Sequence, residues 1–196
     1  MSATSFPDPI RAAARNAFPV EPAQLNSERI RERFGNCGIE ILAETDGLRR
    51  ANLFSIHGGV QTCRTYALVR TLDAPPEITT EHTAIVGGQS IGATFRAGGW
   101  TVAKKTLLTG KLAHSDVEPQ ISALMRLTEA RPVALHAYEL LVEREASRIR
   151  YALILELHHP DYLREEELSS LFPAPVDSPI DRHSLAQFLR HFNILL

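Results

Sequence analysis

The sequence is poor in cysteine and has no long apolar run, which excludes several classes of protein. It carries only two cysteines, Cys37 and Cys63, in 196 residues. Two thiols make neither a disulfide framework nor a cysteine-based metal site, so we expect reduced thiols in a cytoplasmic protein. No apolar stretch approaches the roughly 20 residues of a membrane-spanning helix. The first residues also lack the apolar centre of a signal peptide. We therefore expect no membrane partner.

An excess of charge of one sign is also missing. The formal net charge is −2, and acidic and basic residues are interspersed along the chain. Such a balance gives no strong electrostatic attraction to nucleic acid, so we expect no nucleic-acid partner. The hydrophobic fraction of 44% and the charged fraction of 22% are typical of globular proteins. The length suits one compact domain with extensions.

The hydrophobic pattern predicts an α+β fold in which helices flank an antiparallel sheet. Alternating apolar residues predict strands over 38–45, 51–72 (two strands around His57 to Gly59), 100–112 and 132–159 (a hairpin). Helical patterns are found over 27–35, 79–99 (two short helices separated at Gly87 and Gly88) and 118–127. Residues 1–24 contain four prolines and are interpreted as an N-terminal arm with a short helix over 10–17. Residues 164–196 are interpreted as a C-terminal helical tail, and the domain itself as 25–163.

The strand that ends in LILELHHP carries a glutamate where an apolar residue is expected. Its first face holds Ile149, Tyr151, Leu153, Leu155 and Leu157, which alternation places in the core. The other face carries Glu156 near its end, shortly before Pro160 stops the strand. A glutamate is seldom buried unless it is paired. Glu156 therefore faces either water or a ligand cavity, and the strand alone leaves both interpretations open.

Most familiar chemical motifs are absent. No glycine-rich phosphate loop and no serine nucleophile elbow are present. The adjacent pair His158 and His159 resembles a metal-binding pair, but neighbouring strand residues point to opposite faces. We therefore expect no metal site. Trp100, at the start of a strand, is expected in the core.

Five segments, taken in order, resemble the chorismate lyase (chorismate–pyruvate lyase) family and the related effector domains of GntR-type regulators. They are SERIRERFGNCGIEIL, HGGVQTCRTYALVRTL, SIGATF, WTVAKKTLLTG and RIRYALILELHHP. Together they lie within residues 25–163. No helix-turn-helix pattern comes before them in the sequence, so we expect the lyase rather than the regulator. The resemblance implies a chorismate lyase-like fold.

The resemblance also implies a substrate, products and site residues. Chorismate would be converted to 4-hydroxybenzoate and pyruvate without a metal or organic cofactor. Arg64 would bind the substrate carboxylate, and the backbone N–H groups of Ile30 and Ile91 would assist, with Gly92 beside Ile91. Glu156, with a raised pKa, would serve the ring proton or the nascent hydroxyl.

Three alternatives remain open. The same cavity could serve a non-catalytic domain that binds an aromatic carboxylate. The region 79–99 followed by WTVAKKTLLTG superficially resembles a hot-dog thioesterase or dehydratase. Against this, Glu81 and His82 are expected to precede the helix rather than to line it, which leaves it no catalytic acid. Finally, Arg64 and Glu156 could form a purely structural ion pair across neighbouring strands.

Overall fold

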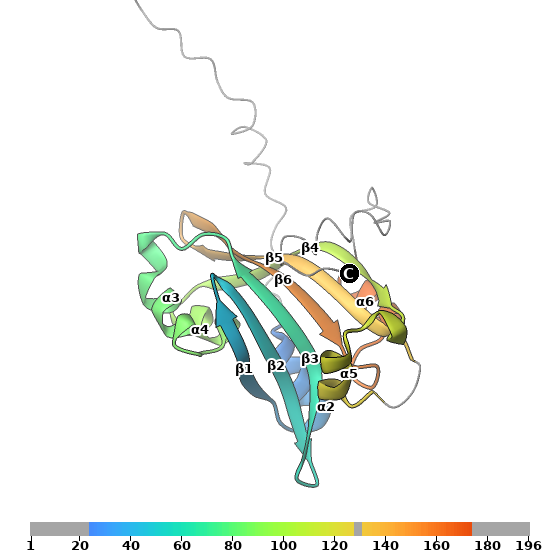
Figure 1. The fold of residues 1–196 in the computed structure, drawn as a ribbon. Coiled ribbons are helices and arrows are strands. Elements are labelled where there is room, and N and C mark those ends of the chain that lie inside the picture. The colour runs from blue at the N-terminus through green and yellow to red at the C-terminus, as the bar shows by residue number, and fades with distance from the viewer. Residues whose placement is uncertain (1–23, 128–130, 174–196) are drawn as a thin grey trace, which may run out of the picture.

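Six antiparallel strands form one sheet in the computed structural model, which describes residues 24–127 and 131–173. The strands are β1 (Gly38–Thr45), β2 (Leu48–His57), β3 (Val60–Thr71), β4 (Thr101–Leu112), β5 (Val133–Arg144) and β6 (Ser147–His158). Their order across the sheet is β1-β2-β3-β6-β5-β4 (Figure 1), so the last strand pairs with β3 at the centre. The predicted α+β class is confirmed.

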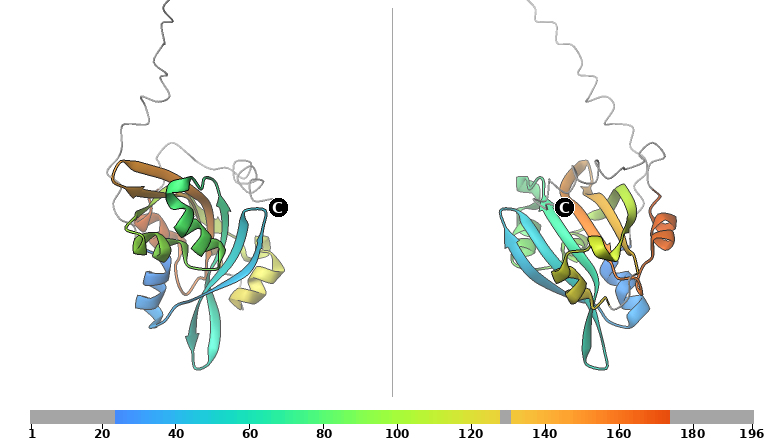
Figure 2. Two further views of the ribbon diagram at one scale, coloured as in Figure 1. Left: turned by 90° about the vertical axis from the view of Figure 1, so that its left-hand side faces the viewer. Right: turned by 45° about the vertical axis from the view of Figure 1, so that its right-hand side comes forward.

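Within the residues that the structure describes, five helices cover the two faces of the sheet unequally. They are α2 (Asn26–Phe34), α3 (Thr79–Val86), α4 (Ile91–Ala97), α5 (Pro119–Met125) and α6 (Glu165–Leu171). Short 3₁₀ turns at Pro76–Ile78 and His114–Asp116 precede α3 and α5. Helices α2, α3, α4 and α6 lie on one face, and α5 packs on the opposite face (Figures 1 and 2). None of the helices within the described ranges is long and apolar enough to cross a membrane. The predicted N-terminal arm and the helix expected near the C-terminus lie outside the described residues.

Local sequence signals set the boundaries of several elements. Helix α2 ends at Gly35, whose left-handed φ of 80° suits a residue without a side chain. The hairpin between β1 and β2 turns at Asp46 and Gly47, both with positive φ, as tight two-residue hairpins require. Strand β2 therefore begins at Leu48, directly after this two-residue turn. The apolar pattern predicted a start three residues later, at Ala51.

A β-bulge in β6 overturns the prediction that its five apolar residues share one face. The pairing with β5 shifts at Tyr151, which has no partner opposite it. An unpaired residue reverses the alternation of side chains on either side of it. Ile149 and Tyr151 therefore pack in the same core cluster as Ile154, whereas Leu155 and Leu157 pack against α5 on the opposite face.

Helices α3 and α4 are attached to the sheet through Trp100, which is 3% exposed, as expected of a core residue. Its indole N–H donates to the buried Glu81 carboxylate at 3.0 Å. Glu81 and His82 lie inside α3, which begins at Thr79 directly after the 3₁₀ turn, so the expectation that they precede the helix is wrong. The Glu81 carboxylate is engaged in a structural hydrogen bond.

Candidate functional site

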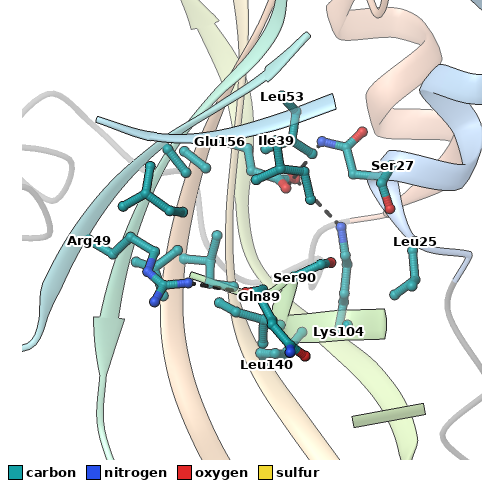
Figure 3. A pocket seen from close by; sticks show the side chains of 18 of the residues that line it. Leu25, Ser27, Ile39, Arg49, Leu53, Gln89, Ser90, Lys104, Leu140 and Glu156 are labelled. Carbon is teal, nitrogen blue, oxygen red and sulfur yellow. Dashed lines mark hydrogen bonds and ion pairs between the residues drawn. The ribbon is translucent and has the colours of Figure 1, made fainter. Parts of the chain in front are cut away.

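A cavity of about 100 Å³ lies between the sheet and the helices α2 and α4 (Figure 3). Its walls are mainly aliphatic side chains, among them Ile39, Ile41, Leu53, Val69, Leu140 and Ile154. Cross-strand register explains its position, because Ile41, Ala51, Ala67 and Glu156 follow one another across β1, β2, β3 and β6. Two alanines at the centre of this row leave unfilled space above the sheet, and Glu156 faces that space.

Arg49 lies on one side of the cavity, with its side chain only 5% exposed. Its Nε and Nη2 donate to Glu44 Oε2 at 3.0 and 2.8 Å. Its remaining hydrogen bonds go to the backbone oxygens of Gln89, at 3.3 Å, and Ile85. Glu44 is 32% exposed, so water can solvate this partner while the guanidinium stays buried.

Glu156 lies on the far side of the cavity from Arg49 (Figure 3). Its side chain is 6% exposed, and Lys104 Nζ lies 3.5 Å from Oε2. Asn26 Nδ2 donates to Oε1 at 3.2 Å. Burial alone would raise the pKa of Glu156, but Lys104 and two nearby histidines outweigh it and lower the pKa to about 2. Glu156 is thus a buried carboxylate anion, so the water-facing interpretation and the expected raised pKa are both wrong.

Lys104 is a residue of the candidate site that the sequence interpretation missed. Its side chain is 5% exposed, and its ammonium lies 4.3 Å from the centre of the Tyr138 ring and 5.3 Å from that of Phe172. Burial lowers the pKa of Lys104, and the Glu156 carboxylate opposes this shift. A signal was present in the sequence, because strand alternation places Lys104 on the same face as Val102, which is buried.

Arg64 does not lie in this cavity. The pairing of β2 with β3 shifts between Leu53 and Phe54, and Arg64 is the unpaired residue of this bulge. Its guanidinium lies 3.9 Å from the centre of the Phe34 ring, at the end of α2, and its Nε donates to Ser55 Oγ at 2.8 Å. It lines a separate, more open depression. The structural ion pair expected between Arg64 and Glu156 is therefore not formed.

The other residues implied by the resemblance are divided between cavity and core. Ile91 and Gly92 line the cavity at the first turn of α4. A Cβ at Gly92 would lie 2.4 Å from Leu25 Cδ2, so glycine permits the close approach of α4 to the chain before α2. Ile30 is fully buried in a core cluster with Tyr162 and Leu168, a residue of the predicted tail. Within α2, the cavity wall is formed by Asn26 and Ser27.

Histidines also gather around Glu156. His136 of β5 lies opposite Glu156 in the sheet, and one nitrogen of each of His136 and His158 lies within 4.8 Å of the other and of a Glu156 oxygen. His159 points elsewhere, since its Nδ1 accepts the backbone N–H of Asp161 at 3.0 Å. The prediction that His158 and His159 cannot share an ion is consistent with this geometry. The sequence interpretation did not consider His136, which comes from a different strand.

Neither cysteine is placed for catalysis. Cys63 is buried on the face covered by α5, and burial raises the pKa of its thiol to about 12. Cys37 is half-buried, and burial also raises its pKa. Both thiols stay protonated at neutral pH and are poor nucleophiles.

Comparison of the chain with models of known protein families and with curated proteins finds no match. The resemblance to chorismate lyase therefore stays a prediction from short sequence segments. The contents of the cavity, a buried guanidinium and a buried carboxylate–ammonium pair around an aliphatic space, provide an independent basis for assigning a function.

Proposed function

We propose that the chain is a chorismate lyase-like enzyme that converts chorismate into 4-hydroxybenzoate and pyruvate. The observation that carries this proposal is that Arg49 and the pair Lys104–Glu156 face one small aliphatic cavity from different sides. A volume of about 100 Å³ is on the scale of the roughly 150 Å³ cavities that hold one benzene ring. It is smaller than those cavities, so the aliphatic walls must move apart to admit the substituted ring of chorismate.

Arg49 is proposed to bind the ring carboxylate. A guanidinium offers two parallel N–H donors that match the two oxygens of a carboxylate, and a dry site strengthens this contact. In the free protein Glu44 satisfies these donors. Because Glu44 is the more exposed partner, it can turn toward water when the ligand carboxylate arrives. Arg49 thus takes the role that the resemblance implied for Arg64.

Lys104 and Glu156 are proposed to act where the ring loses its substituent. The reaction removes a ring C–H proton while the carbon–oxygen bond to the enolpyruvyl group breaks, and the ring becomes aromatic. The departing enolate takes up this proton and tautomerises to pyruvate, so the reaction releases no net proton. The Lys104 ammonium is suited to stabilise the negative charge on the departing oxygen. Glu156, whose pKa is low, is better suited to accept a hydrogen bond from the ring hydroxyl than to store a proton.

The test is to incubate the purified full chain with chorismate and to measure pyruvate with lactate dehydrogenase and NADH. Time-dependent pyruvate, with an equal amount of 4-hydroxybenzoate, is the expected result. Binding of 4-hydroxybenzoate without pyruvate release would identify the chain as a non-catalytic binding domain. Absence of both binding and turnover in a folded sample would contradict the proposal.

Two matched lysine variants test which arginine holds the carboxylate. Arg49→Lys should lower kcat/KM by roughly 10- to 100-fold, because an ammonium keeps the charge but loses the paired donors. Arg64→Lys should retain the activity of the wild type, since Arg64 lies outside the cavity. The reverse result would move the carboxylate site to the depression beside Phe34.

A further inference from the structure

Two buried imidazole nitrogens point at Glu156 without a hydrogen-bond partner. They are His136 Nδ1 and His158 Nε2. They lie 4.0 and 3.7 Å from Glu156 Oε2, and the two histidine side chains are 0% and 2% exposed. A buried polar atom without a partner is unfavourable and calls for an explanation such as a bound ion. Both nitrogens face the same oxygen, Glu156 Oε2. A single ion between these three atoms would therefore give both nitrogens a partner.

The opposite nitrogen of each ring is held by a threonine hydroxyl. His136 Nε2 lies 3.1 Å from Thr106 Oγ1, and His158 Nδ1 lies 3.0 Å from Thr65 Oγ1. If each outer nitrogen donates its proton to the hydroxyl, each inner nitrogen presents a lone pair toward Glu156. Histidines that bind metals have this arrangement, because a hydrogen bond on one nitrogen fixes the tautomer and orients the other.

A histidine must be neutral to bind a metal, and burial favours the neutral form of both imidazoles. Burial, and then the charge of Lys104, lowers the pKa of His136 to about 2. Burial also lowers the pKa of His158, to about 4, although the Glu156 carboxylate opposes this shift. Glu156 supplies the negative charge that a cation needs in a buried position.

We propose that His136, Glu156 and His158 form a binding site for one divalent transition-metal ion, of which Zn²⁺ is the simplest example. Two imidazole nitrogens and one carboxylate oxygen suit zinc, iron(II) or cobalt(II), whereas magnesium and calcium prefer oxygen ligands. Zinc bonds of about 2.0–2.2 Å place tetrahedral ligand atoms roughly 3.4 Å apart. The separations of 3.7 and 4.0 Å to Glu156 Oε2 must shrink to this value, and the two imidazole nitrogens, which lie within 4.8 Å of each other, must also approach.

Lys104 sets the affinity of this site, because its ammonium is the present counter-charge of Glu156 at 3.5 Å. A metal ion would replace the ammonium in that role, and the two cations repel each other. Glu156 and Lys104 line the cavity, which gives an ion a route to the site. Three protein ligands leave a fourth coordination position open.

The test uses the purified full chain after EDTA treatment, titrated with Zn²⁺ in a calorimeter and with Co²⁺ in a spectrophotometer. One ion per chain is expected, and Co²⁺ should develop visible absorption. His136→Gln and His158→Gln should each weaken binding at least tenfold, while His57→Gln, a change in an exposed histidine of β2, should leave it unchanged. Lys104→Met should strengthen binding at least tenfold. Equal binding by the wild type and by both buried-histidine variants would overturn the site, and so would no binding by either the wild type or Lys104→Met.

A measurement on the wild type guards against variants that fail to fold. Pulsed electron paramagnetic resonance of the chain loaded with one equivalent of Cu²⁺ counts coordinated imidazoles, and two are expected. A spectrum without imidazole couplings would overturn the proposal. All of these measurements are made without chorismate, so their results do not depend on whether the chain has lyase activity.

Discussion

At the scale of single residues, Glu156 has a proposed role in catalysis and also forms a buried ion pair that affects stability. Its carboxylate faces the cavity, neutralises Lys104 and accepts a hydrogen bond from Asn26. Asn26 is itself fixed, because Tyr162 donates to its side-chain oxygen and its Nδ2 lies 3.0 Å from Thr65 Oγ1. A substitution at Glu156 therefore changes both the charged end of the cavity and a buried ion pair.

Glu156→Gln should lower turnover by roughly 10²-fold or more, the usual scale for an acid–base or hydrogen-bonding role in the transition state. It should also lower the free energy of unfolding by about 3–5 kcal/mol, because the buried Lys104 ammonium loses its partner. Urea denaturation and pyruvate release measure the two effects separately.

The control is the double variant Glu156→Gln with Lys104→Met, which removes both charges. It should recover most of the lost stability and none of the turnover. Wild-type turnover together with an unchanged melting temperature in the single variant would contradict both roles of Glu156.

At the scale of elements, the cavity depends on how α3 and α4 are held against the sheet. The segment between them supplies Gln89 and Ser90 to the cavity wall, and the first turn of α4 supplies Ile91. The buried bond between Trp100 and Glu81 ties α3 to the start of β4. Gly98 permits this bond, since a Cβ there would lie 2.3 Å from Glu81 Oε1. The Trp100 indole therefore helps to hold the cavity wall in place through α3, although the indole does not line the cavity.

Trp100→Phe should lower the free energy of unfolding by about 1–3 kcal/mol, because a buried carboxylate oxygen of Glu81 loses its donor. The affinity for 4-hydroxybenzoate should fall as well, since the wall between α3 and α4 loosens. Combining Trp100→Phe with Glu81→Leu removes both partners and should restore part of the stability. A single variant as stable as the wild type would show that the hydrogen bond does not hold α3.

At the scale of the whole molecule, the buried polar cluster makes stability depend on pH. The folded pKa values of His136 and His158, about 2 and about 4, lie below the ordinary value of 6.5. Below pH 6.5 the unfolded chain therefore binds more protons than the folded chain, and stability falls as the pH falls. The pKa of Glu156 is also lowered, from 4.5 to about 2, which adds a loss with the same sign below pH 4.5.

We expect the free energy of unfolding to fall between pH 7 and pH 5, by up to about 1.4 kcal/mol per pH unit for each of the two histidines. Urea denaturation at a series of pH values measures this slope. Most carboxylates stay ionised in this window, and His159, whose pKa burial also lowers, acts in the same direction. His158→Gln should reduce the slope, and a stability that is constant from pH 7 to pH 5 would contradict the burial of neutral imidazoles.

The sequence by itself determined the elements of the fold, because the signals that define them are local. Apolar periodicity and turn residues predicted β1 with its observed bounds and the pair of short helices α3 and α4. The same periodicity predicted that Trp100 would be buried. The sequence also identified Glu156 as an unusual residue on a strand face, because that identification requires only the neighbouring residues of the same strand.

Only the tertiary structure decided which side chains share the face of the sheet on which Glu156 lies. Arg49, Lys104 and His136 come from three different strands, and they share one face because of the register across β2, β3, β6, β5 and β4. A bulge moves every following side chain to the other face, and no short sequence pattern announces it. The bulge at Arg64 places that side chain beside Phe34 and outside the cavity, and Arg49 lines the cavity instead. The identity of the site therefore depends on long-range pairing, which alternation within one strand does not encode.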